Sequence, residues 1–183
     1  MKSIICEFPI TEKEYSELDD RFGKLTWHAS HDLKKKNSRN NYIDDPEDIN
    51  QELQISMLRA GSYYKRQIYV EKCLAVAKKY AHDNLMIQIV TELENLWANR
   101  TRHGANRQKY GPFQEKLLEK IVREIVPKEE RPNKKESLKI DAKFATYCKS
   151  IVWNGQKSMG KKITREKSIR SGQVSLSEFD YLQ

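Results

Sequence analysis

The chain has 183 residues, of which 33% are charged and 38% hydrophobic, and it carries a net charge of +8. Its length suits one domain, or one domain with an arm, and the periodic grouping of its apolar residues excludes a wholly disordered chain. No apolar run approaches the roughly 18 residues that a membrane span needs, and the N-terminal residues lack a signal-peptide pattern. The three distant cysteines, Cys6, Cys73 and Cys148, are typical of reduced intracellular thiols rather than of a disulfide framework.

The charge is unevenly distributed along the chain. Residues 1–96 contain 14 Lys and Arg against 16 Asp and Glu, whereas residues 97–170 contain 20 against 8, a net charge of +12. This density of positive charge favours a polyanionic partner for the second segment. A membrane surface is disfavoured as a partner, because no basic helix here has a continuous large apolar face.

The first predicted helix begins at a capping box formed by Thr11 and Glu14. An apolar stripe with spacings of three and four residues follows for about six turns. His28, His31 and Asp32 lie near this stripe, but no further Cys or His completes a metal site. We therefore expect surface or interfacial histidines and no bound metal.

The second predicted helix covers residues 46–60. Asp45 as N-cap and Pro46 in the first turn mark its start, and Gly61 marks its end. Ile55 and Leu58 lie well round from its main apolar stripe, so the helix is apolar over more than half of its circumference. This pattern predicts a central helix that packs against more than one neighbour.

Three more helices are predicted in the middle of the chain, over residues 66–80 and 84–97 and between Pro112 and Pro127. No stretch of the sequence shows convincing strand-like alternation. The predicted fold class is therefore all-α, with about six helices. Residues 98–112 contain no acid, and we interpret them as an exposed basic loop that contacts phosphates through Arg100, Arg102 and Arg107.

The last predicted helix begins at Asp141 and continues to Arg170. It has an apolar face, Trp153 near its middle, and a basic second half that contains Lys157, Lys161, Lys162, Arg165, Lys167 and Arg170. A packed face that runs into a basic, partly aromatic segment is typical of a helix that binds nucleic acid. The alternative is a solvated charged face on an ordinary core helix. Residues 171–183 are interpreted as a tail that turns at Gly172.

The sequence lacks the common catalytic motifs. It contains no Gly-rich phosphate loop, no paired Cys-x-x-Cys and no nucleophile elbow. The neighbouring acids Asp19 and Asp20 point to different faces of a helix, so a metal-dependent nuclease would lack a coherent acid cluster. We therefore predict a protein that is not an enzyme and has no cofactor.

Three stretches resemble bacterial RNA polymerase sigma factors. Residues 48–60, DINQELQISMLRA, resemble the helix with which sigma factors bind core polymerase. Residues 143–162, which begin KFATY, are similar to the helix that melts and recognises the −10 promoter element. Residues 174–178, VSLSE, resemble the string that follows this helix in short sigma factors. The layout is similar to that of the middle-gene sigma-like factors of large Bacillus phages.

The resemblance implies two sets of functional residues. The first set would bind polymerase and comprises Asp48, Gln51, Glu52, Gln54 and Arg59. The second set, to which the basic loop above is added, would bind DNA and comprises Lys143, Thr146, Tyr147, Trp153, Asn154, Lys157, Lys161, Lys162 and Arg165. The implied partners are host core RNA polymerase and promoter DNA, in the bacterial cytoplasm, and the free protein would be a monomer.

Two departures from the family accompany this resemblance. Residues 61–142 would form a helical insertion between the two functional helices of a single domain over 1–170. The helix-turn-helix domain that binds the −35 element is missing, so either the protein works without it or the chain is a fragment. The alternative function is general nucleic-acid binding without contact to polymerase.

Within the DNA-binding set, each residue type has an expected role. Lys157, Lys161 and Lys162 would lie over the phosphate backbone, and Asn154 would contact a base edge or cap a polar face. The ring of Trp153, with small or polar neighbours Asn154 and Gly155, would have room to meet an unstacked base. Tyr147 would either meet a base or pack in the core.

Overall fold

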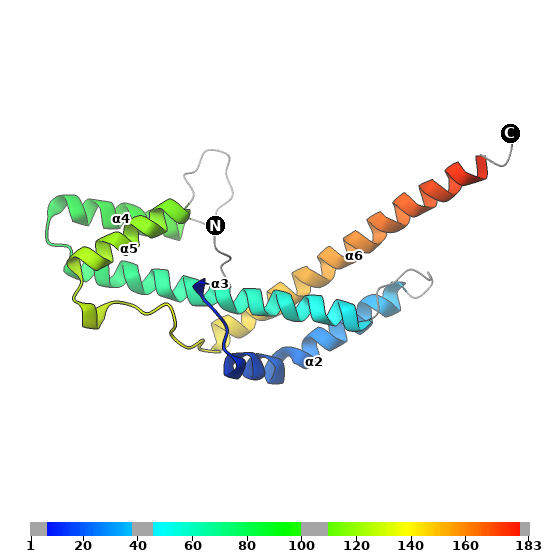
Figure 1. The fold of residues 1–183 in the computed structure, drawn as a ribbon, viewed down its shortest axis with the longest axis horizontal. Coiled ribbons are helices and arrows are strands. Elements are labelled where there is room, and N and C mark those ends of the chain that lie inside the picture. Colours follow the sequence, from blue (N-terminus) through cyan, green and yellow to red (C-terminus); the bar gives the residue numbers. More distant parts are fainter. Residues whose placement is uncertain (1–6, 38–45, 100–109, 180–183) are drawn as a thin grey trace. The chain divides into compact units, whose positions relative to one another are not determined.

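The computed structural model describes residues 7–37, 46–99 and 110–179, and all regular structure in these ranges is helical. Figure 1 shows α2 (Glu12–Asn37), α3 (Pro46–Tyr80), α4 (Asn84–Ala98), α5 (Pro112–Ile125), the 3-10 turn η1 (Lys128–Glu130) and α6 (Ala142–Phe179). The predicted all-α class is confirmed. So are the helix starts at Pro46, Asn84 and Pro112.

The prediction that a helix ends at Gly61 was wrong, because α3 continues through this residue to Tyr80. Gly61 is buried, and a Cβ atom at this position would lie 2.9 Å from Ile10 Cδ1. No glycine in the described residues has the positive φ of a glycine that terminates a helix. The glycine here permits close packing of its neighbours.

The predicted turn at Gly172 was also wrong, because α6 continues past it to Phe179. Glycine in a helix costs about 1 kcal/mol relative to alanine, but it ends the helix only where the backbone changes to the left-handed conformation. Sequence alone cannot separate these two uses of glycine.

The chain divides into two compact units. Unit 1 comprises Met1–Tyr63 and Ser137–Gln183, and unit 2 comprises Tyr64–Glu136. Helix α3 belongs to both, since residues 46–63 lie in unit 1 and residues 64–80 in unit 2. Unit 2 falls inside the segment 61–142 that the sequence suggested as an insertion.

In unit 1, α2, α6 and the first half of α3 surround one core. The rings of Phe22 and Phe144 meet edge to face, and Gln156 Nε2 donates to the backbone carbonyl of Ala29 at 3.0 Å. The Phe22–Phe144 pair comes before the Ala29–Gln156 pair along both helices, so α2 and α6 run parallel. The largest buried side chains of this core include Leu18, Leu53, Met57, Phe144 and Val152.

The buried carboxylate of Glu14 connects the start of α2 to the segment that leads into α6. Thr11 N–H donates to Glu14 Oε2 at 2.7 Å and Glu14 N–H donates to Thr11 Oγ1 at 3.3 Å, which confirms the predicted capping box. The other oxygen, Oε1, accepts the backbone N–H of Leu138. Three residues later Asp141 caps α6, accepting the N–H of Phe144 at 2.8 Å.

Unit 2 contains a second, separate core. Its buried residues come from α3, α4 and α5 and include Val70, Leu74, Ala77, Val90, Leu93, Trp97, Leu118, Ile121 and Val122. A buried carboxylate, Glu115, accepts Arg66 Nε at 2.9 Å. At the end of α5, the guanidinium of Arg131 donates to the carbonyls of Val126 and Arg123 at 2.9 and 2.6 Å. These bonds satisfy carbonyls that the helix itself leaves unpaired.

Cys73 and Cys148 are buried free thiols, one in each unit. Burial raises the pKa of Cys73 to about 11 and that of Cys148 to about 12. Both side chains therefore remain protonated at neutral pH. Cys6 lies outside the described residues.

We predict that Glu14→Ala lowers the free energy of unfolding by about 3 kcal/mol, because it leaves buried N–H donors without an acceptor. The matched control is Glu17→Ala, one turn later, which removes a partly exposed ion pair with Arg21 at 3.0 Å. An exposed pair contributes at most about 1 kcal/mol. Urea unfolding measures both values, and equal losses would show that the link to Leu138 is unimportant.

Candidate functional site

The N-terminal half of α3 exposes one polar face. Asp48, Gln51, Glu52 and Arg59 are exposed on it. On the opposite side Ile49, Leu53 and Met57 are buried in the core of unit 1. The exposure that the sequence predicted for Gln51, Glu52 and Arg59 is therefore confirmed.

Gln54 does not belong to this exposed face. Its Nε2 donates to Asp19 Oδ1 of α2 at 3.3 Å, and the side chain is half-buried. Gln54 lies two residues from Glu52, and residues at this spacing point to different sides of a helix. The residue contributes to the packing of α2 on α3.

Ile55, which sequence reasoning placed away from the core stripe without assigning it a role, is 46% exposed in the middle of the polar face. Tyr63, two turns later on α3, is 49% exposed. Apolar or aromatic side chains surrounded by polar ones are typical of the centre of a protein interface. The sequence contained a signal for this role. Ile55 is three residues from Glu52 and four from both Gln51 and Arg59, so it lies on the same side of the helix as these polar residues.

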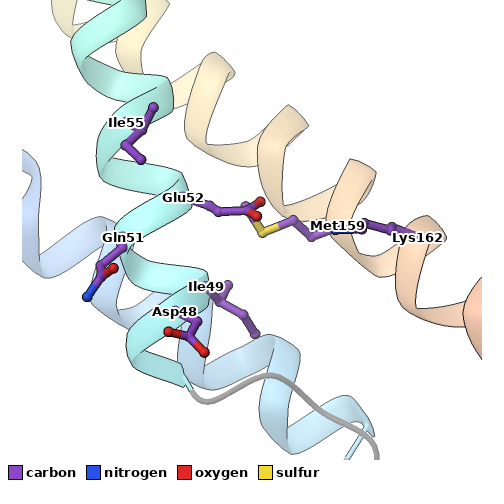
Figure 2. Close-up of a pocket in the computed structure, with 7 residues that line it drawn as sticks. All are labelled: Asp48, Ile49, Gln51, Glu52, Ile55, Met159 and Lys162. Carbon is purple, nitrogen blue, oxygen red and sulfur yellow. The ribbon is translucent and has the colours of Figure 1, made fainter.

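A pocket of about 380 Å³ lies beside this face, between α3 and α6 (Figure 2). Helix α3 contributes Asp48, Ile49, Gln51, Glu52 and Ile55, and α6 contributes Met159 and Lys162. Figure 2 shows Glu52 and Met159 extending toward one another across the pocket. The fold thus brings three residues of the expected polymerase-binding set together with Lys162 of the expected DNA-binding set.

Lys161 and Lys162, which the sequence groups over one phosphate backbone, lie on different sides of α6. Successive residues on a helix are about 100° apart, and Lys162 lies on the side of α6 that faces α3. Lys157 and Lys161 are exposed elsewhere on the helix. Charge runs in a sequence do not show such a division, because it depends on which neighbour covers which side.

The opposite side of α6 is exposed and combines cations with an aromatic ring. Trp153 is 58% exposed, and Lys157 Nζ lies 5.7 Å from the centroid of its ring. The buried side is formed by Phe144, Cys148 and Val152. Other members of the expected DNA-binding set are also exposed on α6, namely Lys143, Thr146, Asn154, Lys161 and Arg165.

Two residues beside this surface, Tyr147 and Gly155, are partly buried. Tyr147 is half-buried, and burial raises the pKa of its phenol, so the side chain is a neutral and partly packed residue. Gly155 does not provide room for the ring of Trp153, because it faces α3: a Cβ atom there would lie 3.0 Å from Leu53 Cδ2. The glycine permits α6 to approach α3 closely beside the pocket.

Arg100, Arg102 and Arg107 lie outside the described residues. Within the residues that are described, no group of His, Cys, Asp or Glu side chains could hold a metal ion. No helix in the described ranges has the length and apolar character to span a bilayer.

The fold and these two surfaces define an all-helical protein with an exposed polar face on α3 and an exposed basic, aromatic face on α6. No protein-family model, curated protein or solved structure matches the chain. The function must therefore be inferred from the residues themselves.

We predict that Gly155→Val destabilises unit 1 by about 1–3 kcal/mol, because the added atoms overlap Leu53 in a packed core. Gly160→Ala on the same helix is the control. Its Cβ would lie 3.6 Å from Leu33 Cδ2, an ordinary contact, so we expect a gain of about 0.5–1 kcal/mol. Thermal and urea unfolding measure both, and a neutral Gly155→Val would mean that α3 and α6 separate at little cost.

Proposed function

We propose that the chain is a sigma-like transcription initiation factor encoded by a phage. In this proposal it binds host core RNA polymerase through the exposed face of α3 and opens promoter DNA through α6. It is not an enzyme, is a monomer when free and works in the bacterial cytoplasm. The observation that carries the proposal is that the stretches resembling the family's two functional helices expose their polar and basic residues on two helices that adjoin at one pocket.

The composition of the α3 face supports docking on a protein. Glu52 and Asp48 supply charge, and Ile55 supplies an exposed apolar centre. Such a face offers both specificity and contact area to a partner helix. Within the proposal, Glu52 is therefore assigned to the contact with polymerase.

The exposed face of α6 supports contact with nucleic acid. Lysines attract phosphates, and the ring of Trp153 offers a flat surface to a base that has left the duplex stack. This same observation also supports the alternative function, a general nucleic-acid-binding protein. Only the proposed function requires binding to core polymerase.

The first test is Glu52→Arg, which reverses a charge at the centre of the proposed contact. We expect unchanged helicity by circular dichroism and a loss of about 2–5 kcal/mol in binding to bacterial core polymerase. Glu71→Arg, an exposed change on the same helix but in unit 2, is the control and should bind normally. If the wild-type chain does not bind core polymerase in a titration, the alternative function replaces this one.

The second test is Trp153→Ala, with Trp27→Ala as the control at another exposed tryptophan, 51% exposed on α2. Stacking of one base contributes about 1–3 kcal/mol, similar to the cost of unstacking a base step. We therefore expect Trp153→Ala to retain polymerase binding but to fail in opening linear duplex promoters, and a pre-melted bubble should restore transcription. Normal transcription from intact duplex would move the melting role to another residue, with Tyr147 next.

A further inference from the structure

The side of α4 that faces away from α3 carries a second apolar stripe. Lys78 of α3 donates to Glu94 Oε2 at 2.8 Å, which shows which side of α4 borders α3. Successive residues on a helix are about 100° apart, so Leu85, Ile89 and Leu96 all lie roughly opposite Glu94. Their spacings of four and seven residues place them on one stripe.

Helix α5 has a matching stripe. Glu115 accepts Arg66 Nε of α3 at 2.9 Å, so this side of α5 borders α3. Phe113 and Leu117, each two residues from Glu115, lie on the opposite side of the helix. Helix α5 runs back along α4, and both helices contribute to one core (Figure 1). The two stripes together form the α4–α5 face, which consists of Leu85, Ile89, Leu96, Phe113 and Leu117.

This face leaves large apolar side chains in solvent. Phe113 and Leu85 are 73% and 63% exposed, the highest values for any large hydrophobic residue in the described ranges. Ile89 and Leu117 pack partly against the core of unit 2, whereas Phe113 and Leu85 stand outside it. An apolar surface of this kind, rimmed by polar residues, is typical of a site that binds another protein.

The spacing of the face matches a helix as the partner. Residues 85, 89, 92 and 96 of α4 follow one another at intervals of four, three and four, and residues 113, 117 and 120 of α5 at intervals of four and three. One helix packs along another with this spacing. Glu92 and Lys120 occupy the polar positions of these stripes, and a lipid bilayer would leave their charges unpaired. A nucleic-acid base does not fit either, since Phe113 is the only ring of the face.

The charges beside the face differ in sign between the two helices. On α5, Lys116 and Lys120 are exposed on the side of Phe113, and Lys116 forms no ion pair within the described residues. Lys120 Nζ lies 3.8 Å from Glu124 Oε1 at the far end of α5, and this pair is weak because both side chains are more than half exposed. On α4, the charged residue beside the face is the exposed Glu92. A complementary helix would therefore carry acids toward α5 and a base toward α4.

We propose that the α4–α5 face binds an amphipathic helix of another protein, whose apolar stripe packs on Leu85 and Phe113. Acidic side chains of that helix face Lys116 and Lys120, and a basic side chain faces Glu92. The family resemblance assigned no role to α4 or α5. The inference goes beyond the proposed function, because it requires neither core polymerase nor nucleic acid.

The experiment titrates a fluorescently labelled synthetic helix of about 20 residues, long enough to run along α4, with the full chain and follows its anisotropy. The probe carries leucines at intervals of three and four, glutamates along one margin and lysines along the other. A control peptide has the same leucines with lysines along both margins. We expect the first peptide to bind and the control to bind roughly tenfold more weakly, because its lysines meet Lys116 and Lys120.

Variants of the chain locate the contact. Phe113→Asp and Leu85→Asp should each weaken binding of the probe roughly tenfold. Ile87→Asp is the matched control, because Ile87 is a 44% exposed apolar residue of α4 on the side of Glu94, and it should change affinity less than twofold. Lys116→Glu combined with Lys120→Glu should reverse the preference between the two peptides. Circular dichroism of each variant shows whether the helices remain formed.

Three results would overturn the inference. The first is that neither peptide binds, or that both bind equally well. The second is that Ile87→Asp weakens binding as much as Phe113→Asp does. The third is that the wild-type chain self-associates in sedimentation and Phe113→Asp abolishes this, because a second copy would then cover the face. None of these variants alters Glu52 or Trp153, so the proposed function stands or fails separately.

Discussion

The buried carboxylate of Glu14 is the interaction on which the arrangement of unit 1 depends. One oxygen completes the cap of α2, and the other accepts the N–H of Leu138, which is 124 residues away in the chain. Unit 2 lies between these two points in sequence, so the bond joins segments that the chain itself keeps apart. A buried acceptor with its donors satisfied holds α6 beside α2 more specifically than apolar contact alone.

Close packing of α6 on α3 then determines the shape of the candidate site. Gly155 lets the two helices approach at Leu53, and beyond this contact the side chains of Met159 and Lys162 border the pocket opposite Glu52. Different sides of a helix face different surroundings, so α6 presents Lys162 toward α3 and exposes Trp153 on another side. A single helix therefore contributes to two separate surfaces, and α3 completes the one at the pocket.

Much of the fold was predictable from local patterns. The cap at Thr11 and the helix start at Asp141 depend on residues within one turn, and hydrogen bonds within one turn confirm them. The exposure of Glu52 followed from the periodicity of its own helix. The errors at Gly61 and Gly172 have one cause. Whether a glycine ends a helix or lies inside one depends on its tertiary surroundings, and the neighbouring residues in the sequence do not reveal them.

The sequence by itself determined the helical class, the apolar stripes of the helices and the concentration of positive charge after residue 96, because periodicity and composition are local properties. Only the tertiary structure decided which side of each helix is covered. It placed Gln54 against Asp19, and it put Lys162, but not Lys161, at the pocket beside α3. The physical reason is that contacts between distant segments depend on how whole helices pack, and no window of neighbouring residues contains that information.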